Sequence, residues 1–320
     1  MPPEQSQVVV RPRSQALAEA GRVLITGATG LVGRGLLEQL PNAWITTRDA
    51  TRAMDKLKLP REQFIEWDPA TPDLRLPDSA SLSGIVNLMG ESVADGRWTA
   101  DKKHRIRDSR VLGTQNLLRS LVAQGTLPTV MVSASAVGFY GDRGEETLVE
   151  SSPPGTGFLA DTCRQWEEAA QEFIHHGCRV VCLRIGLVLS RESGALPQLI
   201  RVMKWGVGGP FGWGRQWYPW IHIDDLVDLI VWSLDKAGLS GPLNATAPEP
   251  VRNRQLVAEV ASRLRRPALL PVPRLAARTL LGEFGDMLFH SQRAIPQVAM
   301  EAGFQFRFGT LGRALDDLIA

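Results

Sequence analysis

Three glycines stand near the start of the chain, between a short apolar run and a helical pattern. The run Val23–Thr26 predicts a strand, and Gly27, Gly30 and Gly33 follow it in the spacing Gly-x-x-Gly-x-x-Gly. Glycine lets the backbone approach phosphate oxygens closely, because no side chain keeps them apart. The N–H groups at the start of the next helix would point at the same turn. The alternative is a plain glycine-rich turn without a ligand.

We therefore expect a dinucleotide to place its pyrophosphate at this turn. The residues predicted to contact it are Gly27, Thr29, Gly30, Leu31, Val32 and Gly33.

The end of the second expected strand indicates which dinucleotide fits. That strand is Ala43–Thr47, and Arg48 follows it, about 20 residues beyond the glycine turn, where such folds recognise the ribose. An acidic residue there would bind a 2′-hydroxyl, whereas an arginine pairs with a 2′-phosphate. The sequence thus predicts NADP(H), with Arg52 as a second phosphate contact. Asp49 keeps NAD open as an alternative, and Arg48 could also be an ordinary surface charge.

These residues need a sheet that brings strand ends to one edge. From Arg22 to about Arg184 the sequence alternates strand-like and helix-like segments, which is typical of an α/β, Rossmann-like, doubly wound parallel sheet. The other expected elements are strands at Phe64–Trp67, Ile85–Met89, Thr129–Ala134 and Arg179–Arg184, and helices at Asp101–Gln124 and Phe158–His176.

In such sheets ligands bind at the carboxyl ends of the strands. We therefore expect further cofactor contacts from the residues that lie there. They are Asp68, Leu88, Met89, Gly90, Glu91, Ser133 and Arg184.

A segment rich in glycine and tryptophan follows Gly186. Residues 206–220 contain five glycines and three tryptophans and fit neither a helix nor a regular strand. We interpret them as a loop over a substrate pocket; the alternative is a structural loop whose aromatic rings fill the core. Asp224 is expected to cap a helix at Leu226–Ala237. The residues predicted to face the substrate are Trp98, Lys102, Gln216, Trp217 and His222.

Composition limits the classes of partner. The 320 residues include 36 basic and 34 acidic side chains, which are interspersed, so nothing indicates nucleic-acid binding. The three cysteines lack metal-ligand spacing, which favours a reducing, cytoplasmic compartment. We expect no metal site, because metal-ligand spacing is missing. We also expect no transmembrane segment, because no apolar stretch has the necessary length.

Three parts follow from these patterns. We expect a flexible N-terminal extension at 1–21, an NADP-binding domain at 22–250 with a substrate loop at 186–225, and a small C-terminal α/β lobe at 251–320. The run Gly303–Phe308 alternates aromatic and polar residues and predicts a strand in that lobe.

Several runs of the sequence resemble one known family. The glycine spacing is the variant found in short-chain dehydrogenase/reductase proteins. The more specific runs are Val86–Glu91, Arg97–Thr99, Ser109-Arg110, Ser133–Gly141, Trp166-Glu167, Leu183–Gly186, Gly208–Gly212, Trp220–Asp225 and Gln292-Arg293 with Pro296.

These runs are similar to those of an atypical short-chain dehydrogenase/reductase group, the epimerase family with a C-terminal domain of unknown function. Its members are often labelled nucleoside-diphosphate-sugar epimerases or cell-division inhibitors. The resemblance covers about residues 22–318 and implies an NADP(H)-binding fold with a compact C-terminal lobe.

The resemblance also indicates where catalytic residues would stand. Typical extended members use a Ser or Thr after the fifth strand and a Tyr-x-x-x-Lys on the next helix; the tyrosine moves the proton, and the lysine lowers its pKa and holds the ribose. Ser135 occupies the position of the serine. Leu159 and Cys163 stand where the tyrosine and the lysine would be, and neither can do that chemistry near neutral pH.

Two functions therefore remain open. The first is an oxidoreductase or epimerase-type enzyme acting on an unknown small carbonyl or hydroxyl substrate through a different proton relay, with Ser135 and Tyr140 as catalytic candidates. The second is a non-catalytic NADP(H)-binding scaffold or division-related regulator. In that case the aromatic loop would bind a protein partner or a second copy of the chain.

Overall fold

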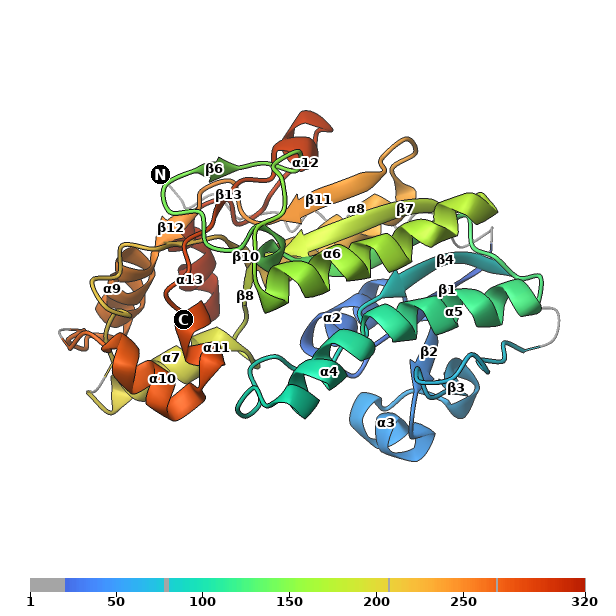
Figure 1. Ribbon diagram of the computed structural model, residues 1–320, viewed down its shortest axis with the longest axis horizontal. Helices are drawn as coiled ribbons and strands as arrows, with labels where there is room; N and C mark the ends of the chain where they lie inside the picture. Colours follow the sequence, from blue (N-terminus) through green and yellow to red (C-terminus); the bar gives the residue numbers. More distant parts are fainter. Residues whose placement is uncertain (1–20, 78–80, 207, 269, 320) are drawn as a thin grey trace, which may run out of the picture.

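A seven-stranded parallel sheet forms the centre of the computed structural model, which describes residues 21–77, 81–206, 208–268 and 270–319 (Figure 1). The strand order is β11-β7-β5-β4-β1-β2-β3, and each neighbouring pair runs parallel. The strands are β1 (Arg22–Thr26), β2 (Trp44–Thr47), β3 (Phe64–Glu66), β4 (Leu82–Asn87), β5 (Val130–Ala136), β7 (Arg179–Ile185) and β11 (Gly241–Ala245). The order reverses between β1 and β4, and such switch points form the ligand crevice of doubly wound sheets. The Rossmann-like α/β fold expected from the sequence is confirmed.

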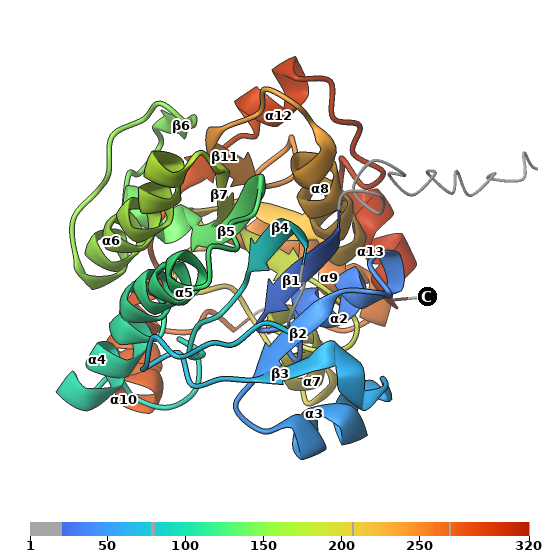
Figure 2. The same ribbon diagram turned by 90° about the vertical axis from the view of Figure 1, so that its right-hand side faces the viewer.

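Helices cover both faces of this sheet, as Figure 2 shows. Consecutive strand residues point to opposite faces, so Leu24 packs in one buried cluster with α5 and α6, and Ile25 packs in the other with α2 and α8. These helices and their neighbours are α2 (Leu31–Gln39), α3 (Ala50–Leu57), α4 (Ala100–Asp108), α5 (Val111–Ala123), α6 (Phe158–Gln171) and α8 (Ile223–Asp235).

A second group of helices lies at the end of the sheet to which its strands point (Figure 1). Its buried cluster combines Leu189, Leu196 and Trp220 with residues from 247 to 318, so the segment after β7 packs with the C-terminal part of the chain. The helices are α7 (Ala195–Lys204), α9 (Asn253–Leu264), α10 (Arg274–Leu281), α11 (Glu283–Met287) and α13 (Leu311–Ile319), whereas α12 (Gln297–Glu301) packs beside β11 (Figure 1).

Short strands connect this group to the rest of the molecule. β8 (Leu187–Leu189) pairs with β10 (Trp220–His222), and β9 (Trp217–Tyr218) pairs with β12 (Val251–Arg252). β6 (Thr147–Leu148) pairs with β13 (Arg293–Ala294). The 3₁₀ turns are η1 (Arg61–Gln63), η2 (Val137–Tyr140) and η3 (Glu172–His176).

Ser291 strengthens these connections. Its N–H donates to Asp142 Oδ1 (2.9 Å), its hydroxyl donates to the Gly144 carbonyl (2.5 Å), and the Trp217 N–H donates to its Oγ (3.0 Å). One serine thus joins three segments that are far apart in the sequence.

Three expectations need correction. The helix expected at Asp101–Gln124 is two helices, because α4 ends at Asp108 and α5 begins at Val111. The strand expected at Gly303–Phe308 is wrong. The carboxylate of Asp225 accepts the backbone N–H groups of Arg307 (2.8 Å) and Phe308 (2.9 Å), which would otherwise be available for a strand partner.

The expected helix cap at Asp224 is also wrong, because α8 begins at Ile223. His222 caps it instead: its Nδ1 accepts the N–H of Asp224 at 3.1 Å. The Asp224 carboxylate pairs with Arg307 at 3.2 Å.

Residues 1–20 of the expected N-terminal extension lie outside the described residues. No helix in the described part of the chain combines the length and the apolar character needed to cross a bilayer.

Candidate functional site

The turn after β1 is shaped by its glycines. Gly27 has φ +70°, and a Cβ there would lie 2.6 Å from the Leu88 carbonyl oxygen. A Cβ on Gly33 would lie 2.5 Å from the Ala28 Cα, so α2 can pack on the turn only without a side chain at this position. Gly30 is the N-cap of α2 and supplies no side-chain hydrogen bond. The first N–H groups of a helix have no partner within the helix. Gly30 is exposed and Gly27 is half-buried, so the turn beside these N–H groups is accessible to a phosphate.

A buried polar network fixes the crevice beside this turn. Thr26 Oγ1 donates to Asn87 Oδ1 (2.8 Å) and accepts the N–H groups of Leu88 (3.1 Å) and Met89 (3.2 Å). Asn87 Nδ2 donates to Ser133 Oγ (3.2 Å). Ser133 is almost fully buried, so its side chain is not accessible to a ligand, and Thr26 fixes the backbone of Leu88 and Met89 at the end of β4.

The side chains after β2 include the residues predicted to recognise the ribose 2′-group of the dinucleotide. Asp49 caps α3, because its Oδ1 accepts the Arg52 N–H at 2.9 Å. Arg48 is exposed, and no ion pair engages it within the part of the chain that the structure describes. Asp68, after β3, is also exposed and accepts the Ala70 N–H at 3.1 Å. Arg48 and Arg52 are thus both exposed and, within the described residues, free of ion pairs, so both guanidinium groups are accessible to a ligand here.

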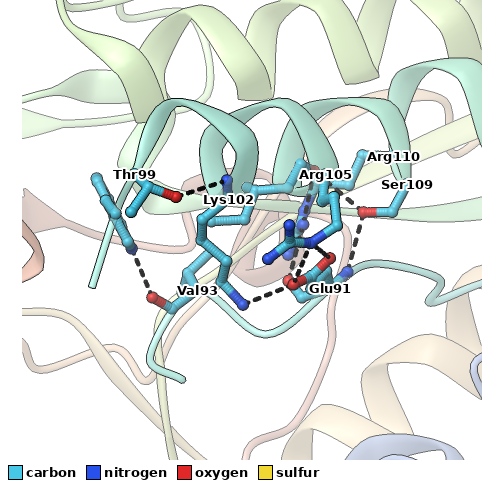
Figure 3. Close-up of polar contacts among 9 residues, drawn as sticks. Glu91, Val93, Thr99, Lys102, Arg105, Ser109 and Arg110 are labelled. Carbon is cyan, nitrogen blue, oxygen red and sulfur yellow. Dashed lines mark hydrogen bonds and ion pairs between the residues drawn. The ribbon is translucent and has the colours of Figure 1, made fainter. Parts of the chain in front are cut away.

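Glu91 and Lys102, both predicted site residues, bind each other (Figure 3). Lys102 Nζ lies 2.7 Å from Glu91 Oε1, and Arg105 Nε lies 3.1 Å from Oε2. The hydrogen bond from Lys102 is the main reason that the pKa of Glu91 lies below its usual value. The Glu91 N–H also donates to Ser109 Oγ (3.0 Å), and Arg110 donates to the Glu91 carbonyl (3.0 Å). The loop after β4 is thus held against α4 and the start of α5.

Arg110 contacts the loop after β4. A Cβ on Gly90 would lie 2.8 Å from the guanidinium carbon of Arg110, so Gly90 permits this approach. The guanidinium also lies 5.2 Å from the centre of the Trp166 ring. Burial is the main cause that lowers the pKa of Arg110, and the nearby Cys163 and Glu91 oppose the shift.

The polar residues at the ends of β5 and β7 bind one another. Arg184 is 4% exposed and pairs with Glu167 through two hydrogen bonds of 2.9 Å each. Ser135 Oγ donates to Glu167 Oε1 at 2.7 Å. The sequence predicted that Arg184 and Ser135 lie at this edge but did not identify Glu167, the carboxylate that binds both. The Trp166-Glu167 run was the pattern that could have identified it.

Tyr140 belongs to the same cluster. Its hydroxyl accepts from Arg184 (3.0 Å) and donates to Asn244 Oδ1 (2.7 Å), and its side chain is fully buried. Burial is the main cause that raises the pKa of Tyr140. The structure therefore places this phenol inside the protein.

Cys163 lies beside Ser135. Burial, with the charge of Glu167 as a second cause, raises the pKa of its thiol to about 11. The position at which a typical relative would have a lysine thus carries a neutral, buried thiol.

A cavity of about 300 Å³ lies beyond η2 and the start of α6. Leu159 and Gly138 form its inner wall, and Trp98, a residue expected from the sequence to face the substrate, is also in the lining. Its outer wall comes from the C-terminal part of the chain, with Asp286, Met287, His290 and Gln292 among the lining residues. Sequence reasoning did not find this wall, apart from the resemblance of Gln292-Arg293, because it lies more than a hundred residues from α6.

The other residues expected to face the substrate have partners elsewhere. Gln216 Nε2 donates to the Leu288 carbonyl (3.0 Å), and Trp217 Nε1 donates to Glu145 (2.9 Å). His222 is 1% exposed and caps α8. No cluster of three or more potential metal ligands occurs among the described residues.

Two family models match parts of this chain. Residues 23–244 match the family model described as the NAD dependent epimerase/dehydratase family. Residues 272–318 match a domain of unknown function, DUF1731.

Two curated relatives are similar over most of their length. "Epimerase family protein SDR39U1 homolog, chloroplastic" of Arabidopsis thaliana is 36% identical over 305 residues, which cover 92% of this chain and 85% of that protein. "Epimerase family protein YfhF" of Bacillus subtilis (strain 168) is 36% identical over 305 residues, which cover 93% of this chain and 98% of that protein.

Two solved structures are also similar. The human epimerase family protein SDR39U1 (isoform2), crystallised with NADPH, has a TM-score of 0.83 and 29% identity over 93% of this chain and 99% of that chain. The nucleoside-diphosphate sugar epimerase from Corynebacterium glutamicum has a TM-score of 0.74 and 34% identity over 95% of this chain and 60% of that chain.

Proposed function

The chain belongs to the NAD dependent epimerase/dehydratase family, and on this premise we propose that it binds NADP(H) and acts as an oxidoreductase or epimerase-type enzyme on a small carbonyl or hydroxyl compound. The observation that carries the proposal is the open turn after β1, where a Cβ on Gly27 or Gly33 would collide with the backbone. The NADPH in the crystals of the similar human protein supports the choice of the phosphorylated dinucleotide.

The residues of this chain fit the cofactor as follows. The glycine turn and the start of α2 hold the pyrophosphate, and Arg48 pairs with the 2′-phosphate. The backbone of Leu88 and Met89, which Thr26 holds by two hydrogen bonds, borders the cofactor crevice between β1 and β4. When bound, NADP(H) supplies or accepts a hydride.

The catalytic part of the proposal rests on Ser135. Its hydroxyl, which donates to Glu167, would turn toward the substrate oxygen and stabilise the charge that develops there. Tyr140 supports this site by holding Arg184, with which it shares a 3.0 Å hydrogen bond.

A titration with NADPH and NADH, followed by a turnover screen, tests the proposal. We expect NADPH to bind more tightly than NADH, and slow NADPH oxidation with some member of a panel of small carbonyl compounds. Ser135→Ala should reduce turnover and leave NADPH affinity unchanged. Equal affinities, or no affinity for either dinucleotide, would contradict the proposal.

One observation favours the non-catalytic alternative. The Ser135 hydroxyl already has an acceptor in Glu167, and Leu159 and Cys163 provide neither a phenol nor an ammonium group. A scaffold that binds NADP(H) without turnover needs none of these groups. Tight NADPH binding together with no turnover on any compound of the panel would favour that function.

A further inference from the structure

The walls of the 300 Å³ cavity carry information about the compound that enters it. Its lining includes Trp98, Phe158, Leu159 and Met287, which are apolar, and none of its lining residues is a lysine or an arginine. Proteins recognise phosphates and diphosphates mainly through arginine forks, lysines and backbone N–H groups. A cavity of this size is also at the small end of ligand pockets. The lining therefore suits a small apolar compound better than a nucleoside diphosphate.

The charged side chains at the cavity point to the same conclusion. Two carboxylates, Glu283 and Asp286, contribute to the lining, and each is paired with a cation outside the lining. Glu283 pairs with Lys103, and Asp286 lies 2.8 Å from Arg274. The hydrogen bond from Arg274 is the main cause that lowers the pKa of Asp286, which keeps that carboxylate ionised. These carboxylates oppose an anionic ligand, and the lysine and the arginine beside them are already engaged, so His290 is the lining residue that could still attract an anion.

The aromatic walls are fixed in place. The Trp98 Nε1–H donates to the Val93 carbonyl at 2.7 Å, and the indole packs edge-on against Phe158 with ring centres 5.3 Å apart. It also contacts Phe284 of the C-terminal lobe, with ring centres 5.9 Å apart. Rings held in this way offer flat surfaces on which another ring can stack.

A carbonyl oxygen would also find donors in this cavity. The start of α6, Gly157–Ala160, borders it, and the first N–H groups of a helix lack partners within the helix. These donors would serve a phosphate as well, so the choice rests on the apolar lining and the carboxylates, and the experiment must include a phosphate compound.

We propose that the substrate is a neutral, planar ring compound that carries a carbonyl or hydroxyl group, and that the C-terminal lobe excludes sugar nucleotides from the cavity. This inference rests on the proposed function, because it names the class of compound on which NADP(H) would act. The compound lies between the Trp98–Phe158 pair and Met287.

Calorimetric titration of the full-length protein loaded with NADP+, which cannot reduce a ketone, tests the inference. The neutral probes are 1-indanone and 2-acetylnaphthalene, and the sugar-nucleotide probe is UDP-glucose. We expect the better ketone to bind at least about tenfold more tightly than UDP-glucose, a difference of about 1.4 kcal/mol. Tighter binding of UDP-glucose, or no binding of either class, would overturn the inference.

Two variants connect the binding to the cavity. Met287→Asp adds a charge to the apolar wall and should weaken ketone binding about tenfold, whereas Met287→Leu should preserve it. The matched control is Met300→Asp, because Met300 is a half-exposed methionine of α12 outside the cavity lining. Equal effects of the two aspartate variants would place the ketone elsewhere and contradict the inference.

NADPH titration of the same protein and variants without added cofactor separates the proposed substrate class from the proposed function. NADPH binding with preference for UDP-glucose would reject only the substrate class. Absence of NADPH binding would reject the proposed function itself.

Discussion

The carboxyl ends of the sheet strands form two halves, an open half after β1 and β2 and a closed half after β5 and β7. The two halves differ in the partners of their polar groups. After β1 and β2, the start of α2 and the guanidinium of Arg48 are open to a ligand. After β5 and β7, Ser135, Glu167 and Arg184 bind one another and are nearly excluded from solvent. The first half is built to receive a group from outside, whereas the second completes its own hydrogen bonds. The contrast explains why cofactor binding is easier to infer from this molecule than the chemical step.

The largest expected effect concerns the closed half. Glu167→Ala would leave the buried Arg184 without its carboxylate, so we expect a loss of about 3–5 kcal/mol of unfolding free energy. Urea denaturation measures it. Glu168→Ala is the matched control, because its exposed pair with Arg164 on the same helix is worth only about 0.3–0.5 kcal/mol. Similar losses for both variants would remove the distinction between the two halves.

The second prediction tests the shape of the open half. Gly27→Ala would bring a Cβ within 2.6 Å of the Leu88 carbonyl at a positive φ, so the turn must move, and we expect NADPH affinity to fall at least about tenfold.

Gly125→Ala is the control for this variant. Gly125 also has a positive φ, +63°, but nothing lies within 4 Å of its added Cβ. It should cost only the backbone strain of about 1–2 kcal/mol in stability and leave NADPH affinity unchanged. Equal NADPH affinities for the two variants would show that the turn does not hold the cofactor.

The third prediction tests the charge of the open half. Arg48→Ala should weaken NADPH binding by about 1.5–3 kcal/mol, the range for a hydrogen bond to a charged group, and barely change NADH binding. Fluorescence titration with both dinucleotides measures the difference. Arg164→Ala, an exposed arginine on α6, should change neither affinity. A parallel loss for NADPH and NADH would contradict the assignment of Arg48 to the 2′-phosphate.

The smallest effect concerns His222, which the sequence assigned to the substrate and the structure buries as a helix cap. Burial lowers its pKa below the ordinary 6.5, although Asp224, Asp317 and Asp225 oppose the shift. The unfolded chain then binds more protons than the folded one, so stability present above about pH 6.5 is lost as the pH falls.

Unfolding free energies measured between pH 5 and 8 test this linkage, for which we expect stability to decrease as the pH falls through the lower part of this range. His222→Asn keeps a cap acceptor and should flatten the profile. An unchanged pH dependence in that variant would assign the effect to another group.

The parts of the fold that the sequence predicted are those with strong local patterns. The glycine turn and the strands β1 to β5 and β7 have apolar runs that end in turn residues. β11 was not predicted, because its run Gly241–Ala245 begins with Gly-Pro and contains few apolar residues. It can form a strand because it lies at the edge of the sheet, where proline is tolerated.

The site was predictable to a different extent. The placement of an exposed side chain such as Arg48 follows from its position along the sheet. The partner of a buried charge, by contrast, depends on packing that a single sequence does not reveal. Glu167 and the cavity wall near Met287 and His290 both depend on such packing, so neither was predicted. The wall is also far from α6 along the chain, so no local pattern links the two.

The hydrogen bonds of Ser291 to Asp142, Gly144 and Trp217 have a consequence for the order of events during biosynthesis. They join the loop after β5 and the strand β9 to a segment near the end of the chain. The ribosome must therefore release nearly the whole polypeptide before the outer wall of the cavity can assemble. A nascent chain that stops earlier can form the glycine turn but not the finished cavity, so binding of a ring compound would report complete maturation of the protein.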